Sequence, residues 1–152
     1  MSDFPRARGQ ELLVLVGLPG SGKTTLRDRH LDGYEVLSKD NRPGAERQIR
    51  ELRALLRAGK SVVVDNTNAS REERAPLLAV ARAEGVPARA VLVDTPEAEV
   101  RRRNAGRGAG KVPSVAINTI RKRLQPPATG EGFASVVRAT PAGDDFAFWE
   151  AG

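Results

Sequence analysis

Residues 11–25 constrain the fold of this chain more than any other stretch. Residues 12–16 are an unbroken apolar run, which is typical of a strand buried on both faces of a parallel sheet. The next eight residues, 17–24, match the pattern G-x-x-x-x-G-K-[ST] at every fixed position, and a helix is expected over residues 23–30. A buried strand, a glycine-rich turn and a helix in this order predict a loop that wraps the phosphates of a nucleotide.

The composition of this loop suits a phosphate ligand. Its glycines let the backbone turn with positive φ and come close to an anion, and successive N–H groups then line the site. We expect Lys23 to reach the β- and γ-phosphates and the hydroxyl of Thr24 to bind Mg²⁺. The predicted nucleotide-binding residues of the loop are Gly17, Pro19, Gly20, Ser21, Gly22, Lys23, Thr24 and Thr25.

The length of 152 residues suits a single domain over residues 1–152. We expect its core over about residues 11–138, with residues 1–10 and 141–152 loosely attached. The chain has no cysteine and one histidine, so a disulfide-linked partner, a thiolate metal site and a multi-histidine metal centre are excluded. Without a membrane-length apolar run or a signal-peptide pattern, the sequence predicts a cytoplasmic protein with no membrane partner.

Strand and helix patterns alternate along the chain. Strands are expected at 34–37, 61–65 and 88–94 and a last one at 133–138, and helices at 44–58, 70–84, from 95 onward and at 112–124. Ser70 with Glu73 fits a capping box, and Thr95 is expected to cap the helix that follows it. The tail around Trp149 shows no strong pattern. The alternation predicts a three-layer α/β P-loop NTPase or kinase fold with a parallel sheet.

Positive charge is concentrated late in the chain. The net charge is +6, and residues 100–130 hold no acidic residue but eight basic ones. This stretch is either a solvated basic face or a surface that binds phosphates or nucleic acid. Within it, residues 105–111 combine three glycines with Arg107 and Lys111, a composition expected of a basic, glycine-rich lid that closes over phosphates; the alternative is a flexible connector.

Three residues are candidates for phosphoryl transfer. Asp40 follows the second predicted strand and could accept the proton of an attacking hydroxyl. Asp65 ends the third predicted strand, where a carboxylate helps to order Mg²⁺, usually through water, or orients the acceptor. Arg107 could stabilise the charge on the transferred phosphoryl group. Asp40 and Arg107 favour an enzyme, because simple nucleotide binding requires neither.

Several motifs together resemble the kinase domain of polynucleotide kinases, which phosphorylate 5′-hydroxyl ends in nucleic-acid repair. The resemblance covers roughly residues 11–137. It rests on the phosphate loop, Lys39-Asp40, Val64-Asp65-Asn66-Thr67-Asn68, Arg103-Asn104 with Arg107, Val112-Pro113 and Gly130-Glu131-Gly132-Phe133.

The resemblance implies a donor, an acceptor and site residues. ATP would be the phosphate donor, with Mg²⁺, and the 5′-hydroxyl end of DNA or RNA would be the acceptor. Asp40 would be the general base, Arg103 and Arg107 would contact the donor, and Asp65 and Asn68 would lie on the acceptor side. Relatives from phages carry an acceptor-contacting arginine three residues after the base, where this chain has Pro43; Arg42, one residue earlier, is the candidate for that contact.

Three functions remain open on the sequence. The first is a polynucleotide 5′-hydroxyl kinase, and the second is a small-molecule kinase on the same scaffold. The third is a non-catalytic nucleotide-binding module. The basic stretch favours the first over the second, because a neutral acceptor does not require it.

Overall fold

The computed structural model describes residues 3–38, 45–106 and 112–152. In this part of the chain six strands form one sheet in the order β2-β3-β1-β4-β5-β6. All neighbouring strands are parallel except the last pair, β5 and β6. The strands are β1 (Leu12–Val16), β2 (Glu35–Leu37), β3 (Val62–Val64), β4 (Ala88–Val93), β5 (Ser135–Ala142) and β6 (Asp145–Ala151).

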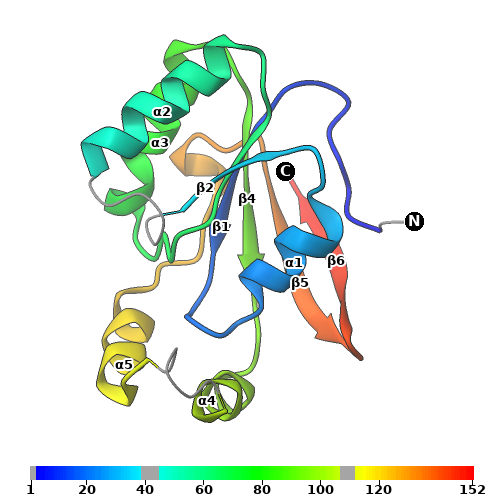
Figure 1. The fold of residues 1–152 in the computed structure, drawn as a ribbon, viewed down its shortest axis with the longest axis vertical. Coiled ribbons are helices and arrows are strands. Elements are labelled where there is room, and N and C mark those ends of the chain that lie inside the picture. Colours follow the sequence, from blue (N-terminus) through cyan, green and yellow to red (C-terminus); the bar gives the residue numbers. More distant parts are fainter. Residues whose placement is uncertain (1–2, 39–44, 107–111) are drawn as a thin grey trace.

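Helices cover both faces of the sheet, which confirms the predicted three-layer α/β P-loop fold (Figure 1). Helices α2 and α3 lie on one face and α1 lies on the other, while α4 and α5 lie beyond the carboxyl ends of the strands. The helices of the described chain are α1 (Lys23–His30), α2 (Ala45–Arg57), α3 (Arg71–Ala83), α4 (Glu97–Ala105) and α5 (Ser114–Arg123), with a 3₁₀ turn at Thr129–Glu131. None of these helices has the length and apolar composition needed to cross a membrane.

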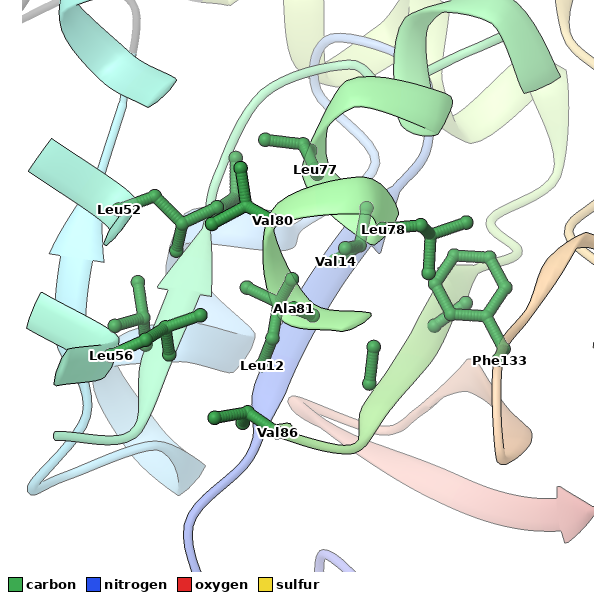
Figure 2. Close-up of a cluster of buried hydrophobic side chains, with 14 of the residues drawn as sticks. Leu12, Val14, Leu52, Leu56, Leu77, Leu78, Val80, Ala81, Val86 and Phe133 are labelled. Carbon is green, nitrogen blue, oxygen red and sulfur yellow. The ribbon is translucent and has the colours of Figure 1, made fainter. Parts of the chain in front are cut away.

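Strand β1 contributes to two cores because successive side chains point to opposite faces of the sheet. Leu12 and Val14 pack with leucines of α2 and α3 (Figure 2). Leu13 and Leu15 belong to the core on the α1 side. All residues of β1 are fully buried, and burial of a leucine side chain stabilises a fold by about 1.5–3 kcal/mol. The strand that leads into the phosphate loop is therefore held from both sides.

Two helix starts differ in detail from the sequence prediction. The Ser70 hydroxyl accepts the Glu73 N–H at 3.1 Å, as a capping residue does. The Glu73 carboxylate, however, accepts the N–H of Ala69 at 3.3 Å instead of that of Ser70, so the capping box is only half formed. The prediction for Thr95 is wrong. Pro96 is the residue before α4, no side chain caps that helix, and the Thr95 hydroxyl is used elsewhere.

The C-terminal tail is part of the sheet, which corrects the expectation of a loose end at residues 141–152. β5 extends to Ala142 and forms an antiparallel hairpin with β6. Phe146 and Phe148 of β6 pack with Phe4, only 5% exposed, in the core on the α1 side. The sequence concealed this hairpin because β5 contains an arginine and a proline and β6 contains two acidic residues, so neither strand alternates regularly between apolar and polar residues.

A buried polar cluster joins the amino ends of several strands. The Arg89 guanidinium donates to both carboxylate oxygens of Glu11, at 2.7 and 2.8 Å, and also to Glu150 at 2.9 Å. The Tyr34 hydroxyl donates to Glu11 at 2.6 Å, and burial together with this bond raises the pKa of Tyr34. These bonds connect β1, β4 and β6 at the end of the sheet that lies opposite the phosphate loop.

Candidate nucleotide and acceptor site

The phosphate loop occupies residues 17–22, between β1 and α1. Gly20 and Gly22 have φ values of 83° and 105°, which only glycine adopts readily. A Cβ at Gly17 would lie 2.7 Å from the Ser21 hydroxyl and 3.1 Å from the Val93 carbonyl. The structure therefore requires glycine at two motif positions for different reasons: Gly17 because of close packing, and Gly22 because of its backbone conformation.

This loop has the features expected of a phosphate site. The N-terminus of α1 has no side-chain cap and no acidic residue in its first turn, so its N–H groups and the positive end of the helix dipole suit an anion. The Ser21 hydroxyl is buried and has no hydrogen-bond partner among the described residues. Such an orphaned polar group is rare in folded proteins and fits a site that a ligand completes.

Lys23 and the threonines that follow it begin α1. The ammonium group of Lys23 donates to the carbonyls of Gly17 and Leu18, at 2.7 and 3.0 Å, and so lies over the loop. Thr24 and Thr25 are exposed in the first turn of the helix. The described residues contain no cluster of three or more histidine or acidic side chains that could hold a metal.

Two residues, Thr95 and Phe146, contact the phosphate loop and support it, a role that the sequence analysis assigned to neither. The Thr95 hydroxyl donates to the Ser21 carbonyl at 2.5 Å. The ring of Phe146 lies so close to Gly22 that a Cβ there would stand 2.8 Å from its Cζ. The chain after β4 and the C-terminal hairpin thus both hold the phosphate loop, and no local motif around either residue indicates this role.

Arg103, which was predicted to contact the donor, lies beside the phosphate loop. Its Nη1 atom would be 3.1 Å from a Cβ at Gly22, and its Nη2 donates to Glu99 at 3.0 Å. The side chain of Asn104 has a different role. It donates to the Val112 carbonyl at 2.5 Å and accepts the Val112 N–H at 2.7 Å, and so joins the two ends of the segment that was predicted to be a lid.

The end of β3 lies next to the phosphate loop because β3 and β1 are neighbours in the sheet. The Gly17 N–H donates to the Thr67 carbonyl at 3.3 Å. Asp65, whose side chain is 7% exposed, forms an ion pair with Arg27 of α1 at 2.9 Å. The sequence analysis did not single out Arg27.

Asn68 was predicted to bind substrate, but its position is structural. The residue is 3% exposed and has a φ of 49°. Its amide donates to the Leu15 carbonyl at 2.7 Å and more weakly to the Val64 carbonyl at 3.3 Å. The side chain therefore connects β1 and β3 within the protein, and a direct substrate contact by Asn68 is not supported. Asp40, Arg42 and Arg107, also predicted site residues, lie outside the described residues.

Glu131, in the Glu-Gly-Phe motif, has a structural role as well. Its two oxygens accept from Nε and Nη2 of Arg74, both at 2.9 Å, and Nη1 of Arg74 donates to the carbonyls of Asn68 and Ala69. Burial alone would raise the pKa of Glu131, but the bonds from Arg74 and from the Ala128 N–H outweigh it and lower that pKa. The motif thus holds the loop after β3 in place.

Five arginines of the basic stretch are paired with three acids from outside it. Arg101 and Arg121 pair with Glu97, while Arg102 and Arg103 pair with Glu99. Arg123 pairs with Glu73 at 2.7 Å. Since Glu97 and Glu99 lie in the first turn of α4, the surface of α4 and α5 is mixed in charge, and it is less basic than the composition of residues 100–130 suggests.

His30, near the end of α1, has a structural role. It is 4% exposed, and its Nε2 lies 2.7 Å from a carboxylate oxygen of Asp145. Its ring packs edge-on against Phe148. The hydrogen bond to His30 is the main reason why the pKa of Asp145 is lowered. Through this contact α1 is fixed to the C-terminal hairpin.

A family model described as an AAA domain (AAA_33) matches residues 42–127. The Schizosaccharomyces pombe bifunctional polynucleotide phosphatase/kinase is 33% identical over 88% of this chain, and the match spans 34% of that protein.

Solved structures of kinases share the fold. A gluconokinase from Sinorhizobium meliloti has a TM-score of 0.64 at 20% identity, covering 90% of this chain and 85% of that one. The Mycobacterium tuberculosis APS kinase, solved with AMPPNP and APS, has a TM-score of 0.58 at 23% identity, covering 89% of this chain and 90% of that one. With more than half of its residues matched by the family model, the chain belongs to the AAA_33 AAA domain family, and its fold is that of the P-loop kinases.

Proposed function

We propose that this chain transfers the γ-phosphate of ATP to the 5′-hydroxyl end of DNA or RNA. The observation that carries the proposal is the junction where the Gly17 N–H contacts the Thr67 carbonyl. It brings the end of β3, which carries Asp65, next to residues 17–22 of the predicted phosphate loop, and a kinase needs donor and acceptor groups close together. The polynucleotide acceptor is inferred from the Schizosaccharomyces pombe relative.

In this proposal the loop N–H groups and Lys23 hold the donor phosphates, and Arg103 adds positive charge from α4. Magnesium, when bound, supplies charge to the β- and γ-phosphate oxygens, and Thr24 is the residue proposed to hold it. The AMPPNP in the APS kinase of the same fold supports ATP as the donor.

The transfer itself is proposed to use residues that lie outside the described part of the chain. Asp40 accepts the proton of the 5′-hydroxyl, and the hydroxyl oxygen forms a bond to the γ-phosphorus of ATP. The bond between the γ-phosphorus and the β–γ bridging oxygen breaks at the same time, and ADP is released. Arg107 stabilises the charge of the moving phosphoryl group, and Arg42 contacts the acceptor. These three roles rest on the sequence pattern and the resemblance.

A small-molecule kinase is the second candidate, and one observation favours it. Five arginines in the basic stretch are paired with Glu73, Glu97 and Glu99, which reduces the charge available to a nucleic acid. The gluconokinase and the APS kinase have the same fold.

The test is transfer of label from γ-labelled ATP to a single-stranded oligonucleotide with a 5′-hydroxyl, in the presence of Mg²⁺. The same oligonucleotide carrying a 5′-phosphate is the control. Label on the first and not on the second is the expected result. Label on neither, while ATP still binds, would favour a small-molecule acceptor, and a panel of sugars and nucleosides would follow.

Two substitutions separate catalysis from binding in this assay. Lys23→Ala should lower turnover by about 10²–10³-fold, because it removes a charge held at the donor phosphates. Asp40→Ala should abolish transfer and leave ATP binding nearly intact. If Asp40→Ala turns over at the wild-type rate, Asp40 is not the base.

A further inference from the structure

Arg27 lies in α1 one turn after Lys23 and faces the end of β3. Its Nη1 donates to Oδ2 of Asp65 at 2.9 Å, and its Nε donates to Oδ1 of Asp28 at 3.1 Å. The side chain of Asp65 is 7% exposed and that of Arg27 is 22% exposed, whereas Asp28 is 63% exposed. The contact with Asp65 is therefore the one that is largely shielded from solvent, and it orients the carboxylate of Asp65, a candidate site residue.

The ion pair bears on the role of Asp65, for which two possibilities stand: help in ordering Mg²⁺ or orientation of the acceptor. A cation site needs net negative charge from its ligands. The guanidinium 2.9 Å from Asp65 neutralises that carboxylate and would repel a divalent ion nearby. A carboxylate paired in this way still accepts hydrogen bonds from neutral donors, so the pair suits an acceptor better than a metal.

The charge of the acceptor gives the pair a second purpose. A polynucleotide carries a negative charge at every phosphate, so an unpaired carboxylate beside its path would repel it. Arg27 cancels that repulsion and keeps the carboxylate in one orientation. Among the phosphate-loop, strand-end and lid motifs, none includes Arg27, and only the packing of α1 against β3 brings the two side chains together.

We propose that Arg27 is a positioning residue for the acceptor. It holds Asp65 as a neutralised, oriented carboxylate that accepts hydrogen bonds from the terminal nucleoside of a polyanionic strand. In this role Asp65 serves the acceptor and not Mg²⁺. The inference rests on the proposed polynucleotide kinase function and identifies which of its substrates Arg27 and Asp65 serve.

The experiment is steady-state kinetics of the full chain with a 5′-hydroxyl oligonucleotide, varying the oligonucleotide, ATP and Mg²⁺ in turn. Arg27→Gln removes the charge, and Arg27→Lys keeps it. Arg29→Gln is the matched control, because Arg29 lies on the same helix, is exposed and bonds to the Asp144 carbonyl instead of the site. Fluorescence anisotropy of the labelled oligonucleotide measures acceptor binding without catalysis, and thermal melting checks that each variant folds.

For Arg27→Gln we expect the KM for the oligonucleotide to rise about tenfold, a loss typical of one charge-assisted contact. The KM for ATP and the Mg²⁺ concentration for half-maximal activity should not change. Arg27→Lys should recover most of the acceptor affinity, and Arg29→Gln should behave as wild type.

Other results would overturn the inference. A shift in the Mg²⁺ requirement of Arg27→Gln would assign Asp65 to the metal. A loss of melting temperature with unchanged acceptor KM, not restored by lysine, would make the pair a purely structural link. If the wild-type chain neither binds nor phosphorylates the oligonucleotide, the proposed function itself fails, and the inference fails with it.

Discussion

Gly22 carries three constraints at one residue. It precedes α1, it has a φ of 105°, and a Cβ at this position would stand 2.8 Å from the ring of Phe146. A side chain here would meet both an unfavourable backbone conformation and a steric clash. The predicted phosphate site is therefore sensitive to substitution of this single residue.

We expect Gly22→Ala to destabilise the fold by about 1–3 kcal/mol through backbone strain, and to weaken ATP binding by more than about tenfold. Urea denaturation and calorimetric titration with ATP measure the two effects. Gly59→Ala is the control, because Gly59 also has a positive φ of 81° but nothing lies within 4 Å of its Cβ position. It should lose stability and keep ATP affinity. Equal ATP affinity in Gly22→Ala and wild type would contradict the proposed phosphate contact.

At the scale of elements, the C-terminal hairpin supports the site without belonging to the sequence motif. Phe146 packs against Gly22, and Asp145 bonds to His30 at the end of α1. The loop and the helix that follows it are thus held against β6. Because β6 is the last strand of the sheet, its loss would expose one side of both.

Truncation of Phe146 tests this support. Phe146→Ala should cost about 3–5 kcal/mol of stability, as is typical for a buried phenylalanine, and should also weaken ATP binding because the loop loses its packing partner. Trp149→Ala on the same strand is the control, since Trp149 is 57% exposed, and it should change neither property much. If the Phe146→Ala protein is destabilised but binds ATP normally, the hairpin stabilises the fold without supporting the nucleotide site.

At the scale of the whole molecule, the buried pair of Arg74 and Glu131 connects α3 to the chain after α5. Arg74 also holds the carbonyls of residues 68 and 69. The pKa of Glu131 is lower in the folded protein than its usual value. The pair therefore stabilises the fold above the pKa of an unfolded glutamate, about 4.3, and this stabilisation is lost as the pH falls through the lower folded-state pKa.

Glu131→Gln should cost about 3–5 kcal/mol at pH 7, because it leaves the buried Arg74 without its counterion. Urea denaturation from pH 7 to pH 3 should show the difference between variant and wild type shrinking below about pH 4. Glu72→Gln is the control, at an exposed position of α3, the helix that carries Arg74. It should change stability by less than about 0.5 kcal/mol at any pH. A difference for Glu131→Gln that stays constant with pH would mean that the pKa of Glu131 is the same in the folded and unfolded states, so that the pair with Arg74 does not lower it.

The sequence by itself determined the local part of this protein. Local features include the glycine-rich loop after a buried strand, the helices with apolar residues on one face, and the glycines that follow those helices. They depend on backbone conformation and on the spacing of apolar residues, and neighbouring residues in the sequence determine both. The order of elements then led to the three-layer α/β fold. Lys23 and the loop glycines were found in the same way.

Only the tertiary structure decided which distant side chains meet. The pairs Arg27–Asp65, Arg74–Glu131 and Phe146–Gly22 join residues far apart in the chain. Packing also gave Asn68 a structural role and paired the arginines of the basic stretch with acids that precede it. The sequence does not distinguish a charged or amide side chain that binds a ligand from one that binds another part of the protein. The packing of the sheet and helices determines which of these two partners the side chain contacts.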